Sequence, residues 1–77
     1  MNAKIEKDIG NNIRMLREEA GYTQEQFSAK LQVIGCDLTR SALAKIEVGQ
    51  RHLYPDEIVK IKTILNISYD RIFDIKN

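Results

Sequence analysis

Apolar residues recur along the first part of the chain at the spacing of one helical face. The members of this stripe, separated by three or four positions, are Ile5, Ile9, Ile13, Leu16 and Ala20. The spacing predicts an amphipathic helix from about Lys4 to Ala20. Gly21 follows, and glycine readily adopts the left-handed conformation that ends a helix.

A second helix is predicted over about residues 23–33. Thr23 is a favourable N-cap, and Gln26 three residues later completes a capping-box pattern. Tyr22 and Phe27 lie on either side of this cap and can form a hydrophobic staple. We therefore expect Phe27 in the core.

A third helix is predicted over about residues 39–48, after a glycine-containing segment at residues 33–38. Thr39 is its expected N-cap, and Leu38 and Leu43 can pack across this cap. Two short helices joined by a turn form the unit that places a helix in the major groove of DNA. Sequence-specific DNA binding is therefore the leading interpretation of this pair.

Two more helices are expected towards the C-terminus. Pro55 suits the first turn of the fourth helix, and Asn66 is its expected C-cap. Its apolar stripe consists of Ile58, Ile61 and Leu65. Ser68 is expected to cap a short fifth helix. Since no segment shows the alternation of a strand, the predicted fold class is all-α, with the 77 residues forming one domain.

The predicted third helix has an outer face of long polar and small side chains. At about 100° per residue, Leu43 and Ile46 lie together on the expected core face. The other side presents Arg40, Ser41, Ala44 and Lys45. Arginine and lysine can donate to guanine, serine can contact bases or phosphates, and small residues let a helix approach a groove closely. An ordinary solvated face is the alternative interpretation.

Three polar residues are expected to act at the junctions between helices. Glu47 falls close to the predicted core face, where a carboxylate needs a partner. Arg17, at the edge of the first apolar stripe, can supply one; the alternative is that both side chains are exposed. Gln24 begins the second helix, whose free N–H groups can hold a phosphate. A polar residue without a partner is the alternative for Gln24.

Composition changes this picture only modestly. The formal net charge is +1, which is low for a DNA-binding protein. One Cys and one His are too few for a metal site, and no glycine-rich phosphate loop is present. We therefore expect no enzyme activity, metal, cofactor or small-molecule substrate. With no membrane-length apolar run, no secretory signal and no possible internal disulfide at Cys36, a cytoplasmic protein is expected.

The ordered combination of these residues resembles the XRE family, the Cro and phage-repressor type of helix-turn-helix protein. The resemblance covers about residues 9–73. Its main carriers are Ile9, Ile13, Leu16, Arg17, Glu18, Glu19, Gly21, Thr23, Gln24, Glu25, Phe27, Ala29, Leu31, Arg40, Ser41, Leu43, Lys45, Ile46, Glu47, Gly49, Arg51 and the final segment 65–73. It implies a compact five-helix, lambda-repressor-like DNA-binding fold and a transcriptional regulator, which we expect to be a repressor.

The resemblance also implies roles for individual residues. Base contacts are implied for Arg40, Ser41, Ala44 and Lys45. Contacts to the DNA backbone are implied for Gln24, Gln50, Arg51 and His52. An Arg17–Glu47 ion pair is implied as well, because an arginine on the first helix pairs with a glutamate ending the third in such proteins.

Two features depart from the family pattern. The connection between the second and third helices is longer than usual, and Val33 to Cys36 are the extra residues. They can either extend the second helix or bulge outward, which leaves the tilt of the third helix open. Val48 stands where the family often has asparagine, so one backbone contact is expected to be missing.

Double-stranded DNA is the expected partner, bound by a homodimer on a palindromic site. Candidate dimer contacts are Tyr69, Ile72, Phe73 and Ile75, which can instead close the core against the first helix. The alternative functions are a protein-interaction module or an antitoxin-type partner protein that uses the same fold.

Overall fold

The computed structural model describes residues 2–75, and this part of the chain contains helices but no strand. The helices are α1 (Ala3–Glu19), α2 (Gln24–Val33), α3 (Arg40–Glu47), α4 (Pro55–Leu65) and α5 (Tyr69–Ile72). The predicted all-α, five-helix fold class is confirmed, and the helix bounds closely follow the expected ones. None of these helices has the length and hydrophobicity that crossing a bilayer requires.

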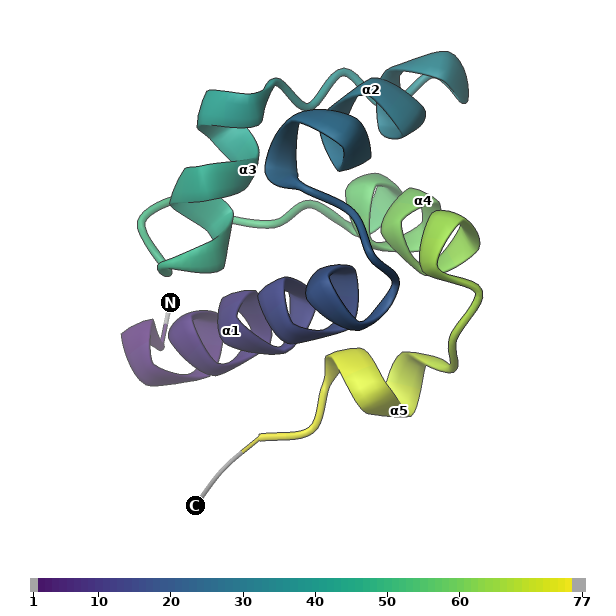
Figure 1. The fold of residues 1–77 in the computed structure, drawn as a ribbon. Helices are drawn as coiled ribbons and strands as arrows, with labels where there is room; N and C mark the ends of the chain where they lie inside the picture. Colours follow the sequence, from purple (N-terminus) through teal and green to yellow (C-terminus); the bar gives the residue numbers. More distant parts are fainter. Residues whose placement is uncertain (1, 76–77) are drawn as a thin grey trace.

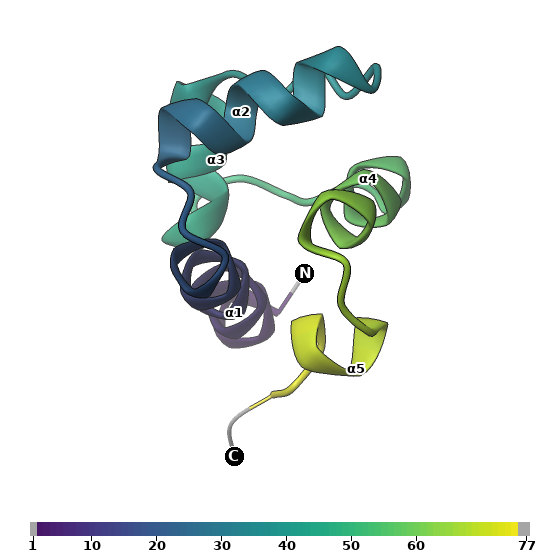
Figure 2. The same ribbon diagram turned by 45° about the vertical axis from the view of Figure 1, so that its right-hand side comes forward.

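The five helices surround one core. α3 packs against α1 and α2, α4 packs against α2, and α5 packs against α1. Figure 1 shows α2 and α3 above α1, with α5 below it, and the turned view in Figure 2 shows α4 on the side away from α3. The outer side of α3 therefore lies at an edge of the molecule.

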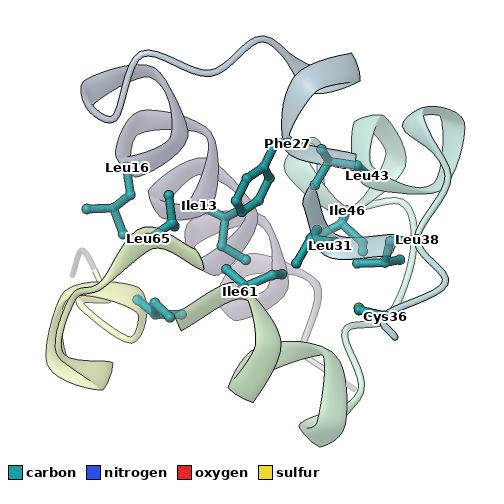
Figure 3. Packing of buried hydrophobic residues seen from close by; sticks show 11 residues of the cluster. Ile13, Leu16, Phe27, Leu31, Cys36, Leu38, Leu43, Ile46, Ile61 and Leu65 are labelled. Carbon is teal, nitrogen blue, oxygen red and sulfur yellow. The ribbon is translucent and has the colours of Figure 1, made fainter. Parts of the chain in front are cut away.

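The core receives side chains from every helix (Figure 3). Its buried hydrophobic members are Ile13, Leu16, Phe27, Leu31, Cys36, Leu38, Leu43, Ile46, Ile61, Leu65 and Ile72. The stripe predicted on α1 is buried only in its middle. Ile5 is 40% exposed and Ala20 is exposed, so the stripe packs into the core only between Ile9 and Leu16.

Helix caps follow the sequence where a threonine provides them. Thr23 forms the predicted capping box with Gln26, and the rings of Tyr22 and Phe27 stack with their centroids 5.9 Å apart. Thr39 Oγ1 accepts a hydrogen bond from the backbone N–H of Ala42 at 3.1 Å. Ser68 occupies the N-cap position of α5, but its side chain forms no capping hydrogen bond.

The long connection between α2 and α3 is ordered. Its first residues extend α2 to Val33, and Gly35 then adopts a left-handed φ of 86°, which a side chain would disfavour. The N–H of Cys36 returns to the carbonyl of Leu31 at 2.9 Å. Ser28 Oγ donates to the carbonyl of Leu38 at 2.7 Å. These hydrogen bonds fix both ends of the connection. The extra residues therefore lengthen the segment between α2 and α3 and leave it attached to α2 at both ends.

Cys36 lies inside this connection and is 6% exposed. Burial disfavours the charged thiolate and raises the pKa of its thiol. The thiol therefore acts as a small apolar core group.

α5 and the residues after it are fastened to α1. Ile72 is fully buried, and the buried Asn12 Nδ2 donates to the carbonyls of Ile72 at 2.9 Å and Asp74 at 2.8 Å. Ile72 thus closes the core. Tyr69 and Phe73 remain 41% and 42% exposed, so of the candidate dimer contacts only these two present a large apolar surface.

α3 approaches α1 closely at Gly10, which is buried. A Cβ at this position would collide with the backbone carbonyl of Ile46. At the end of α3, Gly49 has a left-handed φ of 77°, and a Cβ there would lie 3.0 Å from Cα of Lys7. The C-terminal end of α3 therefore rests directly on the backbone of α1.

Gly10→Ala is expected to reduce the free energy of unfolding by about 1–3 kcal/mol, because the added methyl group forces two backbones apart. This loss outweighs the gain in helix propensity, which is about 1 kcal/mol. Urea denaturation measures the change. Asn11→Ala, at the neighbouring exposed position of α1, is the control and should change stability little. An unchanged or higher midpoint for Gly10→Ala would contradict the close contact.

Candidate nucleic-acid interface

The two faces of α3 are sharply different. Leu43, Ile46 and Glu47 are buried, while Arg40, Ser41 and Lys45 are exposed. Ala44 lies half-buried between them. This confirms the core face deduced from the angular positions. Within residues 2–75, the side chains of Arg40, Ser41 and Lys45 form no hydrogen bond or ion pair, so their donors are available to a ligand.

The buried end of α3 is held by an ion pair with α1. Arg17 Nε donates to Glu47 Oε2 at 2.8 Å, and Arg17 Nη2 donates to Glu47 Oε1 at 3.0 Å. The two side chains are 8% and 1% exposed. The hydrogen bonds to Glu47 raise the pKa of Arg17. Arg17 Nη1 also donates to the carbonyl of Tyr22 at 2.7 Å, so one guanidinium joins α1, the start of α2 and the end of α3.

Gln24 joins the same cluster. Its Nε2 donates to Glu47 Oε1 at 3.0 Å, which leaves the half-buried side chain turned towards α3. The amide group that was expected to reach a phosphate is thus held inside the protein. The N–H of Gln26 donates to Thr23 Oγ1, so the backbone N–H groups of Gln24 and Glu25, which lack helical acceptors, are the donors that remain at this end for an anion.

The residues after α3 are also engaged within the protein. Arg51 donates to both carboxylate oxygens of Glu57, at 3.0 and 3.1 Å, and to the carbonyl of His52 at 2.8 Å. The bonds to Glu57 raise the pKa of Arg51. His52 Nδ1 lies 2.7 Å from Glu6 Oε1, whereas Gln50 is exposed. Of the three residues after α3 that are implied for backbone contacts, Gln50 alone has a side chain unengaged within residues 2–75.

Glu57 is a structural residue whose role the sequence analysis missed. Besides Arg51, its Oε1 accepts the backbone N–H of Tyr54 at 3.0 Å. A signal was available, because an acid at the third position of a helix that begins with proline is placed to cap its own N-terminus. The clamp fixes the course of the chain between α3 and α4.

These contacts bring the candidate residues to one side of the molecule. Gln24 meets the C-terminal end of α3 through Glu47, and Gln50 follows that end directly. Arg40 lies at the other end of α3, about 10 Å away at 1.5 Å per residue. Within residues 2–75, no three Cys, His, Asp or Glu side chains gather in a way that could hold a metal ion.

Two consecutive short helices, the second with a free outer face and a firmly anchored inner face, define a helix-turn-helix DNA-binding protein. A helix-turn-helix family model matches residues 13–72, which is most of the chain. The chain therefore belongs to the XRE family of helix-turn-helix proteins and is a DNA-binding transcriptional regulator. No curated protein and no solved structure matches it significantly.

Proposed function

We propose that this protein is a cytoplasmic repressor that reads a specific double-stranded DNA sequence by placing α3 in the major groove. The observation that carries the proposal is the outer face of α3. Arg40, Ser41 and Lys45 are exposed there without partners among residues 2–75, so DNA can meet them without breaking bonds within the protein. The anchored inner face holds the helix at a fixed angle.

The proposed contacts divide between bases and phosphates. Arg40, Ser41 and Lys45 reach base edges, and Ala44 lets the helix approach the groove floor. Gln50 and the N-terminal N–H groups of α2 contact phosphates. Arg51 acts mainly by holding the turn after α3 through Glu57, and His52 holds the same turn against Glu6.

We further propose that the protein binds as a homodimer. Two copies on half-sites about one helical turn, or 34 Å, apart multiply the specificity of a single short helix. Among the exposed apolar groups, we propose the rings of Tyr69 and Phe73 for the contact between copies. Analytical ultracentrifugation with and without DNA measures the oligomeric state of the protein. A single copy bound to every duplex would contradict the dimer.

The function is tested by selecting binding sites from random duplex DNA and measuring affinity for the winner at several salt concentrations. We expect a palindromic consensus whose affinity falls steeply with salt, because phosphate contacts release counterions. Weak binding to every duplex without enrichment would contradict sequence reading. It would favour a protein partner for the same fold, and capture of that partner would become the next experiment.

Arg40→Ala and Lys45→Ala are each expected to weaken binding to the selected site by about 1–3 kcal/mol and to relax preference at one base pair. Titration against the consensus and its single-base variants measures both effects. Lys60→Ala removes the same charge from α4, a helix outside the helix-turn-helix unit, and should leave binding unchanged. Equal losses on all sequences would show a phosphate contact instead of a base contact.

A further inference from the structure

We propose that Lys7 on α1 is part of the DNA-binding surface and neutralises a backbone phosphate beside the turn that follows α3. The inference rests on the proposed function and adds a residue from outside the two helices of the helix-turn-helix unit. A phosphate bound here would lie next to the one contacted near Gln50.

The backbone of α1 places Lys7 against this turn. A Cβ on Gly49 would lie 3.0 Å from Cα, 3.1 Å from Cβ and 3.2 Å from the backbone nitrogen of Lys7. One helical turn further along α1, Gly10 touches the carbonyls of Ile46 and Glu47. The stretch of α1 from Lys7 to Gly10 therefore runs along the end of α3, and Lys7 borders directly on Gly49, the residue before the exposed Gln50.

The charge of Lys7 is available. Its side chain is exposed and forms no ion pair or hydrogen bond within residues 2–75. The adjacent acids are engaged elsewhere: Glu6 lies 2.7 Å from His52 Nδ1, and Asp8 accepts from Lys4 at 2.7 Å. The ammonium group of Lys7 is therefore exposed and unpaired within residues 2–75, and its acidic neighbours have other partners.

The basic residues of the turn after α3 already have partners within the protein. Arg51 is the basic residue that the turn itself provides, but it is bound to both oxygens of Glu57. His52, the next residue, lies against Glu6. Lys7 supplies from α1 an exposed positive charge beside this turn, where the charge of Arg51 is paired with Glu57. As a flexible point charge, its ammonium group suits a phosphate more than a base edge.

The test compares Lys7→Gln with Lys60→Gln, a matched loss of charge on α4. Fluorescence anisotropy gives the dissociation constants for the selected site and a scrambled duplex at several salt concentrations. For Lys7→Gln we expect about 3- to 10-fold weaker binding at physiological salt, by the same factor on both duplexes, and a salt slope shallower by about 1. Lys60→Gln should match the unmodified protein, and Lys7→Arg should keep its affinity and slope.

The outcomes separate this inference from the proposed function. If the unmodified protein binds its selected site and Lys7→Gln does so with the same affinity and slope, the inference fails and the function stands. An equal loss in Lys60→Gln would reveal a general charge effect and overturn it. A loss confined to one sequence would overturn the phosphate contact. If the unmodified protein binds no duplex, the function and the inference both fall.

Discussion

Glu47→Ala is expected to lower the free energy of unfolding by about 3–5 kcal/mol, because it leaves the buried guanidinium of Arg17 without its counter-charge. The Nε2 of Gln24 loses its acceptor at the same time. Since small proteins are stable by only about 5–15 kcal/mol in total, the variant should be largely unfolded at moderate urea concentrations. Urea denaturation followed by circular dichroism gives the value.

Glu18→Ala is the matched control for this experiment. Glu18 also lies near an arginine, with 3.8 Å between its Oε1 and Arg14 Nε, but both side chains are more than half exposed. Exposed pairs of this kind contribute little, so its removal should hardly move the midpoint. A double variant, Arg17→Met with Glu47→Leu, should recover much of the stability lost by Glu47→Ala. A midpoint unchanged by Glu47→Ala would remove the buried pair as a source of stability.

Phe27→Ala is expected to lower the free energy of unfolding by about 3–5 kcal/mol. Removing a buried aromatic ring leaves a cavity that the surrounding structure fills only in part. Phe27 is fully buried among side chains of several helices (Figure 3) and stacks on Tyr22. The substitution therefore removes both a core group and the staple at the start of α2.

Val33→Ala on the same helix provides the comparison for Phe27→Ala. Val33 is 85% exposed, so shortening its side chain removes almost no buried surface. Thermal unfolding of both variants should give a large drop in melting temperature for Phe27→Ala and a negligible one for Val33→Ala. Similar melting temperatures for the two would contradict the burial that the structure assigns to Phe27.

Features encoded by neighbouring residues were the ones predictable from sequence. Thr23 and Thr39 cap helices through bonds to residues three positions away, and Gly35 ends α2 through its own backbone conformation. Such signals need no knowledge of the fold. The buried face of α3 followed from Leu43 and Ile46 in the same way, because helical geometry fixes their angular positions.

Most contacts between distant segments escaped the sequence; the Arg17–Glu47 ion pair, 30 positions apart, was the exception. His52 contacts Glu6, 46 positions away, and Asn12 contacts Ile72, 60 positions away. The residues around His52 and Asn12 in the sequence do not indicate these partners. The sequence around Gly10 gives no sign of its close contact with α3, which depends on how the two helices pack. Arg51 was expected at the DNA backbone from the family pattern. Its contact with Glu57, six positions away, was not foreseen, because Glu47 and Asp56 are closer in sequence.

The hydrogen bonds from Asn12 to the carbonyls of Ile72 and Asp74 fix the position at which a polypeptide fused after residue 75 would leave the protein. It keeps the described chain at residue 75 below α1, while α3 lies above α1 in both views (Figures 1 and 2). A fluorescent reporter joined beyond that end would project away from bound DNA, and immobilisation through it would present α3 to solution.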